Sequence, residues 1–324
     1  MQPAGCIYKT MGKGSQKAPR SRVKHLKYAG ITQKTLDSYR KQVRLFFEYL
    51  HVHRICMPSS LDELDAEASE YVNHMYQEGE PHGYATTFVS GLKRLYPKCR
   101  KRLDIATQFC KHWTKTLRRK RAMPLPANVV VGMAGLAYAF GEPRVGISLL
   151  VGFLGLLRTG ELLSLTVGHI KIASPRLCIV SLPGSKGSHQ KGFDETVLLH
   201  DPVVVGLLRN VVTHLRPDER LFPGSFRDLD RAIRRYAAYF GIEGRSLTPY
   251  CLRRGGATWH FSKYASMDAT QALGRWEHAS TAKGYINQAV SDSVAVSLDV
   301  AGRARAERCA RVLSRLACSS PSRP

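Results

Sequence analysis

Residues 248–258 read TPYCLRRGGAT, an arginine pair in a segment that its proline can start as a helix. LGRW follows at 273–276 and GYI at 284–286, so that Tyr285 lies nine residues after Trp276. Planar guanidinium groups can hold phosphate oxygens through paired N–H donors, and a phenol can act as a nucleophile. These stretches therefore contain the groups needed to break a phosphodiester by covalent attack.

A third arginine lies about a hundred residues upstream. Arg158 directly follows the apolar run 146–157, and a guanidinium in that place must leave the core or meet an anion. Glu161, three residues later, can orient it. An ordinary salt bridge at the edge of the core is the alternative, just as a lone tyrosine such as Tyr285 is more often a core residue.

A lysine in a predicted hairpin completes the set. Lys186 lies in a turn rich in Gly and Ser between two strand-like segments, 177–182 and 196–199. A lysine can protonate a leaving alkoxide. Lys191 lies in the same turn and is the alternative for this role.

The composition favours a protein that binds a polyanion. The chain has 324 residues, 44% of them hydrophobic, which suits two domains with real cores. Its formal net charge is +24, and nucleic acid is the usual partner of so basic a surface. A membrane is the rival partner, but the apolar run 145–157 is too short to span a bilayer, and no apolar signal core follows the N-terminal charges.

The cysteines and acids do not form a metal-site pattern. The eight cysteines are scattered, without zinc-site spacing, and no acidic triad suggests a magnesium site. We therefore expect no cofactor, and reduced thiols in a protein of the nucleus if the host is eukaryotic, otherwise of the cytoplasm.

The N-terminal third is predicted to hold a basic arm and a helical domain. Residues 1–28 carry seven Lys and Arg and no acid, which indicates a disordered arm that meets phosphate. Apolar residues then recur at helical spacing across 29–117, with a capping box of Ser60 and Glu63. The expected helices are 32–50, 60–75, 84–95 and 105–117.

A second domain is predicted after a basic linker. Residues 118–126 hold four consecutive cations and then two prolines, which is typical of a linker. The domain spans 127–300, followed by an Arg-rich, partly helical tail over 301–324. Its expected helices are 128–140, 145–157, 203–215, 227–240, one from 250 and one that ends at 274. The whole chain should be mainly α with a small antiparallel β-sheet, as a helical N-terminal domain plus a mixed α+β domain.

Together and in this order, these residues resemble the tyrosine recombinase, or phage-type integrase, family over about residues 30–300. Arg158 matches its first arginine, and Arg253 the second, in the His-x-x-Arg box. Lys186 matches the lysine of the β-hairpin, Trp276 the His/Trp position, and Tyr285 the nucleophile at its usual spacing. The RRGGAT and GRW stretches are more similar to eukaryotic mobile-element recombinases than to bacterial ones.

The resemblance implies a helical domain that binds the DNA core site and a catalytic domain, which clamp the duplex together. It implies strand cleavage through a 3′-phosphotyrosine intermediate, without metal, and rejoining to a 5′-hydroxyl of a second duplex. Double-stranded DNA is the expected partner, bound by a homo-oligomer, a tetramer on two sites. The basic run itself, apart from the resemblance, is expected to contact DNA phosphates, with a nuclear-import signal or a merely solvated charge run as the alternatives. The expected DNA contacts are Arg118, Arg119, Lys120, Arg121, Arg254 and Arg275.

One departure from the family pattern affects the expected chemistry. Tyr250 stands where the family has the histidine of its His-x-x-Arg box. A phenol, whose ordinary pKa is about 10, can donate a hydrogen bond to phosphate but accepts a proton poorly at neutral pH. A sequence-specific DNA-binding protein that has lost catalysis is therefore one alternative. A type IB topoisomerase, with the same site chemistry, is another. A C-terminal helix over 312–316 that docks into a neighbouring protomer would favour the recombinase.

Overall fold

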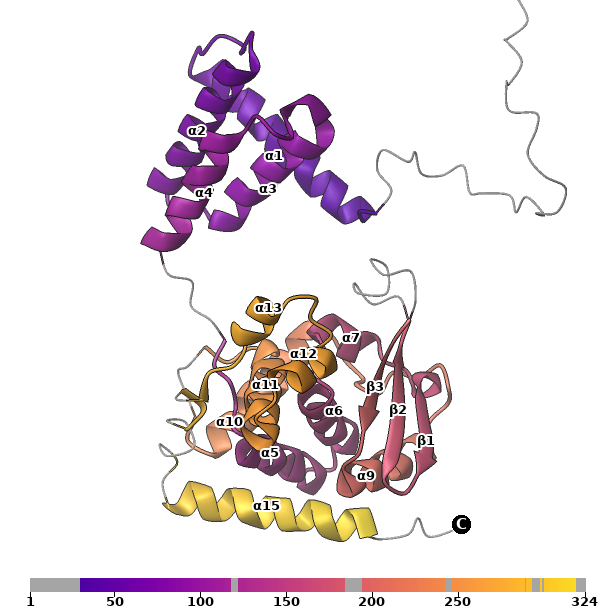
Figure 1. Ribbon diagram of the computed structural model, residues 1–324. Helices are drawn as coiled ribbons and strands as arrows, with labels where there is room; N and C mark the ends of the chain where they lie inside the picture. Colours follow the sequence, from indigo (N-terminus) through magenta and orange to yellow (C-terminus); the bar gives the residue numbers. More distant parts are fainter. Residues whose placement is uncertain are drawn as a thin grey trace, which may run out of the picture. The chain divides into compact units, whose positions relative to one another are not determined.

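The computed structural model describes residues 30–117, 122–183, 194–242, 246–288, 290–292, 298 and 300–318. The chain divides into two compact units, Met1–Arg119 and Lys120–Pro324 (Figure 1). The division falls inside the predicted linker. Across the described ranges, no helix combines the length and the apolar character that crossing a membrane requires. The predicted arm and Arg118, Arg119, Lys120 and Arg121 lie outside these ranges.

The first unit is helical, as its apolar spacing predicts. Its elements are α1 (Gln33–Val52), α2 (Leu61–Gln77), α3 (His82–Leu95), a 3-10 turn η2 (Pro97–Cys99) and α4 (Asp104–Thr116). The apolar faces of these helices meet in a core that includes the aromatic rings of Phe46, Tyr71 and Phe88. The ring of Phe46 lies 5.0 Å from that of Phe88 and 5.4 Å from that of Tyr71, between centroids.

Polar side chains in this unit serve helix ends. Ser60 accepts the N–H of Glu63 at 3.1 Å, but the Glu63 carboxylate bonds Ser59 rather than Ser60, so only half of the predicted capping box forms. Asp65, buried on α2, accepts the N–H groups of Ile105 and Ala106 at 2.9 and 3.0 Å. This carboxylate caps α4 from forty residues away, which local spacing cannot predict.

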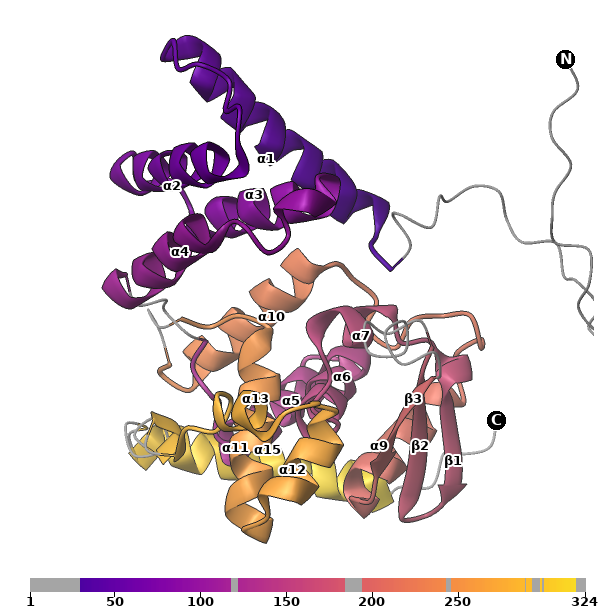
Figure 2. The same cartoon turned by 45° about the horizontal axis from the view of Figure 1, so that its top comes forward.

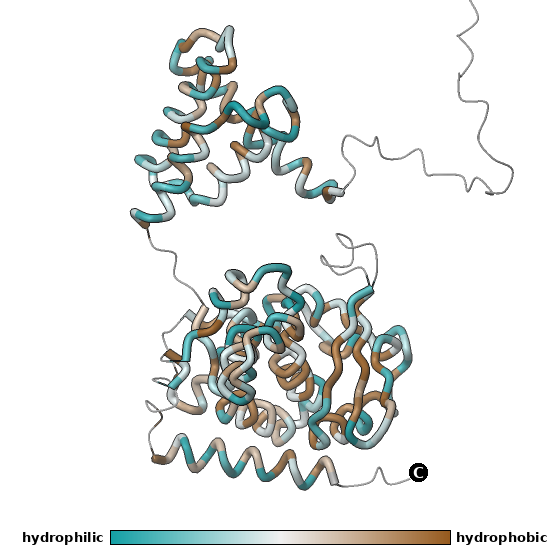
Figure 3. The backbone as a smooth tube through the Cα atoms, in the orientation of Figure 1, coloured by the Kyte–Doolittle hydropathy of each residue, from teal (hydrophilic) through white to brown (hydrophobic). Residues whose placement is uncertain are grey.

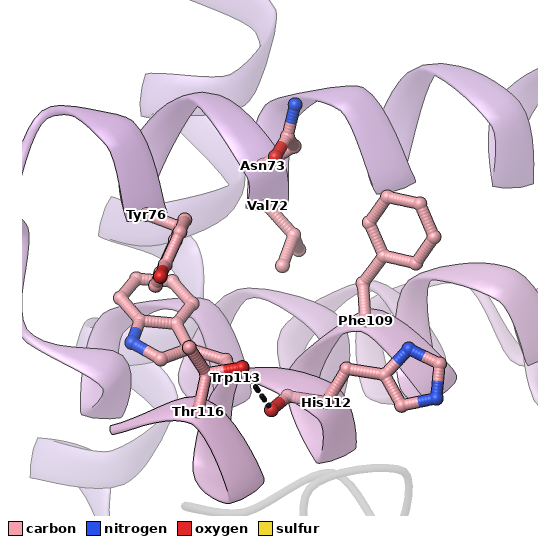
Figure 4. Close-up of a pocket in the computed structure, with 7 residues that line it drawn as sticks. All are labelled: Val72, Asn73, Tyr76, Phe109, His112, Trp113 and Thr116. Carbon is pink, nitrogen blue, oxygen red and sulfur yellow. Dashed lines mark hydrogen bonds between the residues drawn. The ribbon is translucent and has the colours of Figure 1, made fainter.

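A small pocket of about 220 Å³ separates α2 from α4 (Figure 4). The α2 side chains that line it are Val72, Asn73 and Tyr76, and the α4 side chains are Phe109, His112, Trp113 and Thr116. The rings of Tyr76 and Trp113 meet edge to face with 5.3 Å between centroids. The large rings between α2 and α4 thus leave a cavity that the packing of these two helices does not fill.

The second unit combines a helical centre with a small sheet (Figures 1 and 2). Its elements are α5 (Ala127–Ala139), α6 (Pro143–Leu154), α7 (Thr159–Ser164), η3 (Val167–His169), β1 (Ile170–Ser174), β2 (Leu177–Leu182), β3 (Glu195–Leu199), α9 (Pro202–Val212), α10 (Phe226–Tyr239), α11 (Tyr250–Tyr264), α12 (Met267–Gly274), α13 (Ala279–Lys283) and α15 (Val300–Cys318). The strands are antiparallel in the order β1-β2-β3. The predicted fold class, mainly α with a small antiparallel sheet, is confirmed.

Two short elements escape the sequence pattern. β1 has only five residues, and although its first four alternate between half-buried and exposed positions, none is fully buried, so its sequence signal is weak. α7 has six residues, too few to show a helical period. By contrast, β2 and β3 alternate buried and more exposed positions, and they occupy the two predicted strands almost residue for residue. Figure 3 shows hydrophobic residues gathered along α6 and these strands.

The predicted C-terminal tail is instead part of the second unit. α15 packs along α5 and α9, at the opposite edge of this unit from α13 in Figure 1. A side chain at Gly135 of α5 would lie 2.1 Å from the carbonyl oxygen of Cys309, so the two backbones touch directly. Asn210 donates to the carbonyl of Leu316 at 3.1 Å, and Leu313 is buried. The helix therefore packs on its own unit, and docking of this segment into a neighbouring protomer stays a prediction.

Candidate active site

Arg253 forms the buried centre of the site. α11 starts directly after Pro249 and carries Arg253 on its first turn, with 1% of the residue exposed. Its Nη1 donates to the carbonyl of Leu156, and its Nη2 donates to that of Gly274 at 2.5 Å. Within the described residues its Nε has no hydrogen-bond acceptor. Burial, with Arg275 and Arg158 nearby, lowers the pKa of Arg253 to about 10.

A left-handed turn brings Arg158 to the same place. The predicted helix 145–157 ends at Leu154, because Leu156 adopts φ of 46°, a conformation that costs a non-glycine residue about 1–3 kcal/mol. The turn aims the Leu156 carbonyl at Arg253 and leads into Arg158 at the start of α7. The prediction that Glu161 orients Arg158 is confirmed, since its carboxylate accepts from the Arg158 backbone N–H at 2.8 Å and from Nη1 at 2.5 Å.

Trp276 covers one face of Arg253. The guanidinium carbon lies 4.7 Å from the centroid of the indole ring, which is 8% exposed. The indole in turn needs Gly274, because a side chain there would come within 2.0 Å of the ring. The ring of Tyr285 packs on Trp276 with 4.5 Å between centroids and lies 5.5 Å from the guanidinium of Arg253.

The hydroxyl groups of Tyr250 and Tyr285 form a hydrogen bond with each other. Tyr250 stands at the start of α11 and is 39% exposed. Partial burial and the bond to Tyr285 raise the pKa of Tyr250 well above its usual range, although the charges of Arg253 and Arg158 oppose the rise. Tyr250 is therefore a neutral hydrogen-bonding group at physiological pH.

Thr258 holds the backbone around Tyr285 and was missed by sequence reasoning as a site residue. It is buried on α11, and its hydroxyl accepts the N–H of Asn287 at 3.2 Å and donates to the carbonyls of Arg254 and Tyr285 at 2.9 and 3.5 Å. The available signal was its helical spacing, four residues after Arg254.

Glu195 is a second residue that sequence reasoning missed. It is buried at the start of β3, paired with Leu182 of β2, at the base of the predicted hairpin turn. Its Oε2 lies 3.6 Å from Nη1 of Arg158 and 3.4 Å from Nε of Arg275. A glutamate at the first position of a mostly apolar strand was the sequence signal that could have identified it as a site residue. Lys186 and Lys191, in the turn itself, lie outside the described residues.

Two of the predicted DNA contacts, Arg254 and Arg275, lie within the described residues. Arg254 is 5% exposed, and the Arg275 side chain is also 5% exposed and bonded to Glu161 at 2.7 Å. Both side chains are thus buried in the domain, and their contact with DNA stays a prediction. Five predicted site residues do converge, and they come from α7, α11, the loop after α12 and the segment after α13. They are Arg158, Tyr250, Arg253, Trp276 and Tyr285.

Comparisons with known proteins identify the fold. No protein-family model matches the chain, and no curated protein matches it. Among solved structures, the Tn1549 transposon integrase in complex with circular intermediate DNA is 16% identical, with TM-score 0.55, and covers 81% of this chain and 97% of its own. The XerH site-specific recombinase bound to the palindromic difH substrate is 12% identical, with TM-score 0.54, covering 81% and 79%.

A lambda integrase dimer bound to a COC′ core site is 16% identical to this chain, with TM-score 0.51, and covers 81% of this chain and 74% of its own. Identities this low establish shape rather than activity. The two units together match recombinases and integrases over four fifths of the chain, and the described part of the chain therefore has the tyrosine recombinase fold.

Proposed function

We propose that this protein is a site-specific DNA recombinase that cleaves and rejoins strands through covalent attack by Tyr285. One observation carries the proposal. Arg158, Tyr250, Arg253, Trp276 and Tyr285, spread over more than a hundred residues of sequence, lie together in one site.

In the proposed step, the Tyr285 hydroxyl oxygen attacks the scissile phosphorus and loses its proton to water. The bond from phosphorus to the 5′-oxygen breaks, which leaves a 3′-phosphotyrosine and a 5′-oxygen that takes a proton from Lys186. Arg158 and Arg253 hold the non-bridging oxygens as negative charge grows. Removing one such preorganised donor typically costs about 3–4 kcal/mol of transition-state stabilisation. A 5′-hydroxyl of a second duplex reverses the step and completes the exchange.

Binding of the phosphate requires Tyr285 to move. In the free protein the rings of Trp276 and Tyr285 lie over the guanidinium of Arg253. The Thr258 hydroxyl holds the backbone here, since it accepts the N–H of Asn287 and lies 3.5 Å from the carbonyl of Tyr285, so a rotation of the phenol side chain is the smallest movement that uncovers Arg253. The same rotation breaks the bond to Tyr250 and frees the nucleophilic oxygen.

Double-stranded DNA and further copies of this chain are the proposed partners. The formal charge of +24 suits a duplex. The XerH and Tn1549 structures are complexes with DNA, and the lambda integrase structure is a dimer on its core site. Exchange between two duplexes needs at least one nucleophile on each, so we propose a homo-oligomer on two DNA sites.

The test is covalent trapping. The full chain is incubated with a library of random duplexes, SDS-stable adducts are isolated, and the enriched duplex is used for all later assays. We expect adducts with the parent and with Tyr264→Phe, a matched control because Tyr264 is exposed on the same helix as Tyr250. Tyr285→Phe should give none, with DNA affinity within about twofold, because one oxygen is lost and little surface. An adduct with Tyr285→Phe would assign the nucleophile elsewhere.

A DNA-binding protein without catalysis is the second candidate. The observation that favours it is Tyr250, a neutral phenol at the position where a proton acceptor is expected. A parallel selection of the same library by binding alone, followed by the adduct assay on the selected duplexes, separates the two functions. Sequence-selective binding without any adduct from the parent, on nicked or intact duplexes, would establish this candidate and reject the recombinase.

A further inference from the structure

Arg275 connects three separate segments around the site. It follows α12 directly, with φ of 57°, and its guanidinium turns inward. It donates to the carbonyls of Gly155 and Leu273 at 3.2 Å and of Leu156 at 3.3 Å. It also donates to Oε2 of Glu161 at 2.7 Å. The turn before Arg158 is thereby tied to the loop that carries Trp276.

The carboxylates that hold Arg275 are those that hold Arg158. Glu161 bonds Arg275 through Oε2 and Arg158 through Oε1, at 2.7 and 2.5 Å. Glu195 contacts Nε of Arg275 at 3.4 Å and Nη1 of Arg158 at 3.6 Å. Because Glu195 pairs with Leu182 at the base of the hairpin, the network also reaches the strands that flank the turn with Lys186.

Arg275 also contributes positive charge to this cluster. Arg158 and Arg275 face Glu161 and Glu195, and Arg253 is buried close by. Without Arg275 the same two carboxylates would have one cation fewer against them, and the potential at the phosphate site would be less positive.

We infer that Arg275 is a positioning residue, which orients Arg158 and sets the charge of the phosphate site without contacting DNA. The inference rests on the proposed function. It replaces the sequence-based prediction that Arg275 contacts DNA, since a side chain bonded on the inner side of two loops has no edge directed at a ligand.

The test compares Arg275→Lys with Arg308→Lys, a matched control because Arg308 is exposed on α15. A lysine at 275 keeps the charge but cannot bond two carboxylates and three carbonyls together. We expect single-turnover adduct formation to fall about 10- to 100-fold, while the dissociation constant for DNA and its dependence on salt stay unchanged. Arg308→Lys should leave the rate as it is.

A double-mutant cycle separates positioning from general damage. If Arg275 acts through Arg158, then Arg275→Lys should slow adduct formation less than about threefold in an Arg158→Lys background. Glu195→Gln provides a second route to the same test, because it breaks the network from the hairpin side while keeping the shape of the side chain. It should show the same loss of rate and the same dependence on Arg158.

Three outcomes would overturn the inference. If Arg275→Lys and Glu195→Gln both leave the rate of adduct formation unchanged, Arg275 has no positioning role. A salt slope flattened by about one unit assigns Arg275 to a phosphate contact. If Arg275→Lys lowers the rate of adduct formation by the same factor in the parent and in the Arg158→Lys background, its role is merely structural. If the parent chain itself forms no adduct, the proposed function has failed, and that result is distinct from all three.

Discussion

The two units bury different kinds of side chain. The core of the first unit is built on rings and aliphatic groups around Phe46, and its buried carboxylate, Asp65, completes a helix end. The second unit has a larger apolar core but also encloses Arg253, and it buries Glu161 and Glu195 at 2.7 and 3.4 Å from the guanidinium of Arg275. Buried charges stabilise a fold poorly, because their desolvation offsets most of their attraction.

The difference agrees with the proposed function. The interior of the first unit follows the usual preference for apolar residues. The second unit holds guanidinium groups in a dry place, at a cost in stability, and under the proposed function they would act strongly there on a phosphate. Local rules are broken most often at functional sites, and here they are broken in one unit.

The largest effect that we expect comes from Glu161→Ala. The change leaves Arg158 and Arg275 without their closest carboxylate, and breaking a buried pair in this way costs about 3–5 kcal/mol. Hydrogen exchange read by mass spectrometry across a urea series, which reports each unit separately, should place the loss in the second unit. Glu48→Ala in the first unit is the control, because its pair with Arg44 is exposed and such pairs contribute about 1 kcal/mol or less. Equal losses would contradict the comparison.

Asp65→Ala tests the same comparison in the first unit. Removing this carboxylate leaves the N–H groups of Ile105 and Ala106 without their acceptor, and the loss of a helix cap costs about 1–2 kcal/mol. The same exchange measurement should show the loss in the first unit alone. Adduct formation at saturating protein should not change, and a fall comparable to that of Glu161→Ala would mean that both buried acids serve the site.

A smaller effect is expected from Tyr250→His. Burial and the bond to Tyr285 raise the pKa of Tyr250, so its phenol stays protonated and cannot accept a proton at neutral pH. Imidazole, with an ordinary pKa of about 6.5, accepts one as pH rises through that value. Cleavage by the variant should therefore increase between about pH 5.5 and 7.5 and exceed that of the parent about three- to tenfold at pH 7.5.

Single-turnover cleavage of a suicide duplex at several pH values measures this change, with Tyr250→Phe as the control that can neither donate nor accept. A large drop for the histidine variant, with no rise across that pH range, would show that the site is built around the phenol.

The smallest expected effect is that of chelation. Within the described ranges, no group of three or more His, Cys, Asp or Glu side chains could hold a metal ion. Arginines supply the charge in the proposed mechanism, where a metal would otherwise do so. Adduct formation should stay within about twofold when EDTA is added in excess. A loss that magnesium restores would replace the tyrosine mechanism with a metal-dependent one.

Much of the fold could be read from local spacing. The helices of the first unit follow apolar residues such as Phe46 and Leu50, and β2 and β3 follow alternation, because these periods depend only on near neighbours. The order of Arg253, Trp276 and Tyr285 likewise predicted a common site. The observed element bounds differ from the predicted ones by up to three residues. The predicted helix 145–157, for example, ends as α6 at Leu154, because Gly155 and Leu156 break it before the apolar run ends.

Only the tertiary structure decided which charges are buried and what they meet. Arg275 bonds the carbonyl of Gly155, 120 residues away, and Asp65 caps a helix forty residues ahead. α15 lies on its own unit because the small residue Gly135 lets two backbones touch. Such contacts depend on where separate segments meet in space. The sequence determined the periodic elements and the set of reactive groups, and long-range packing determined their partners.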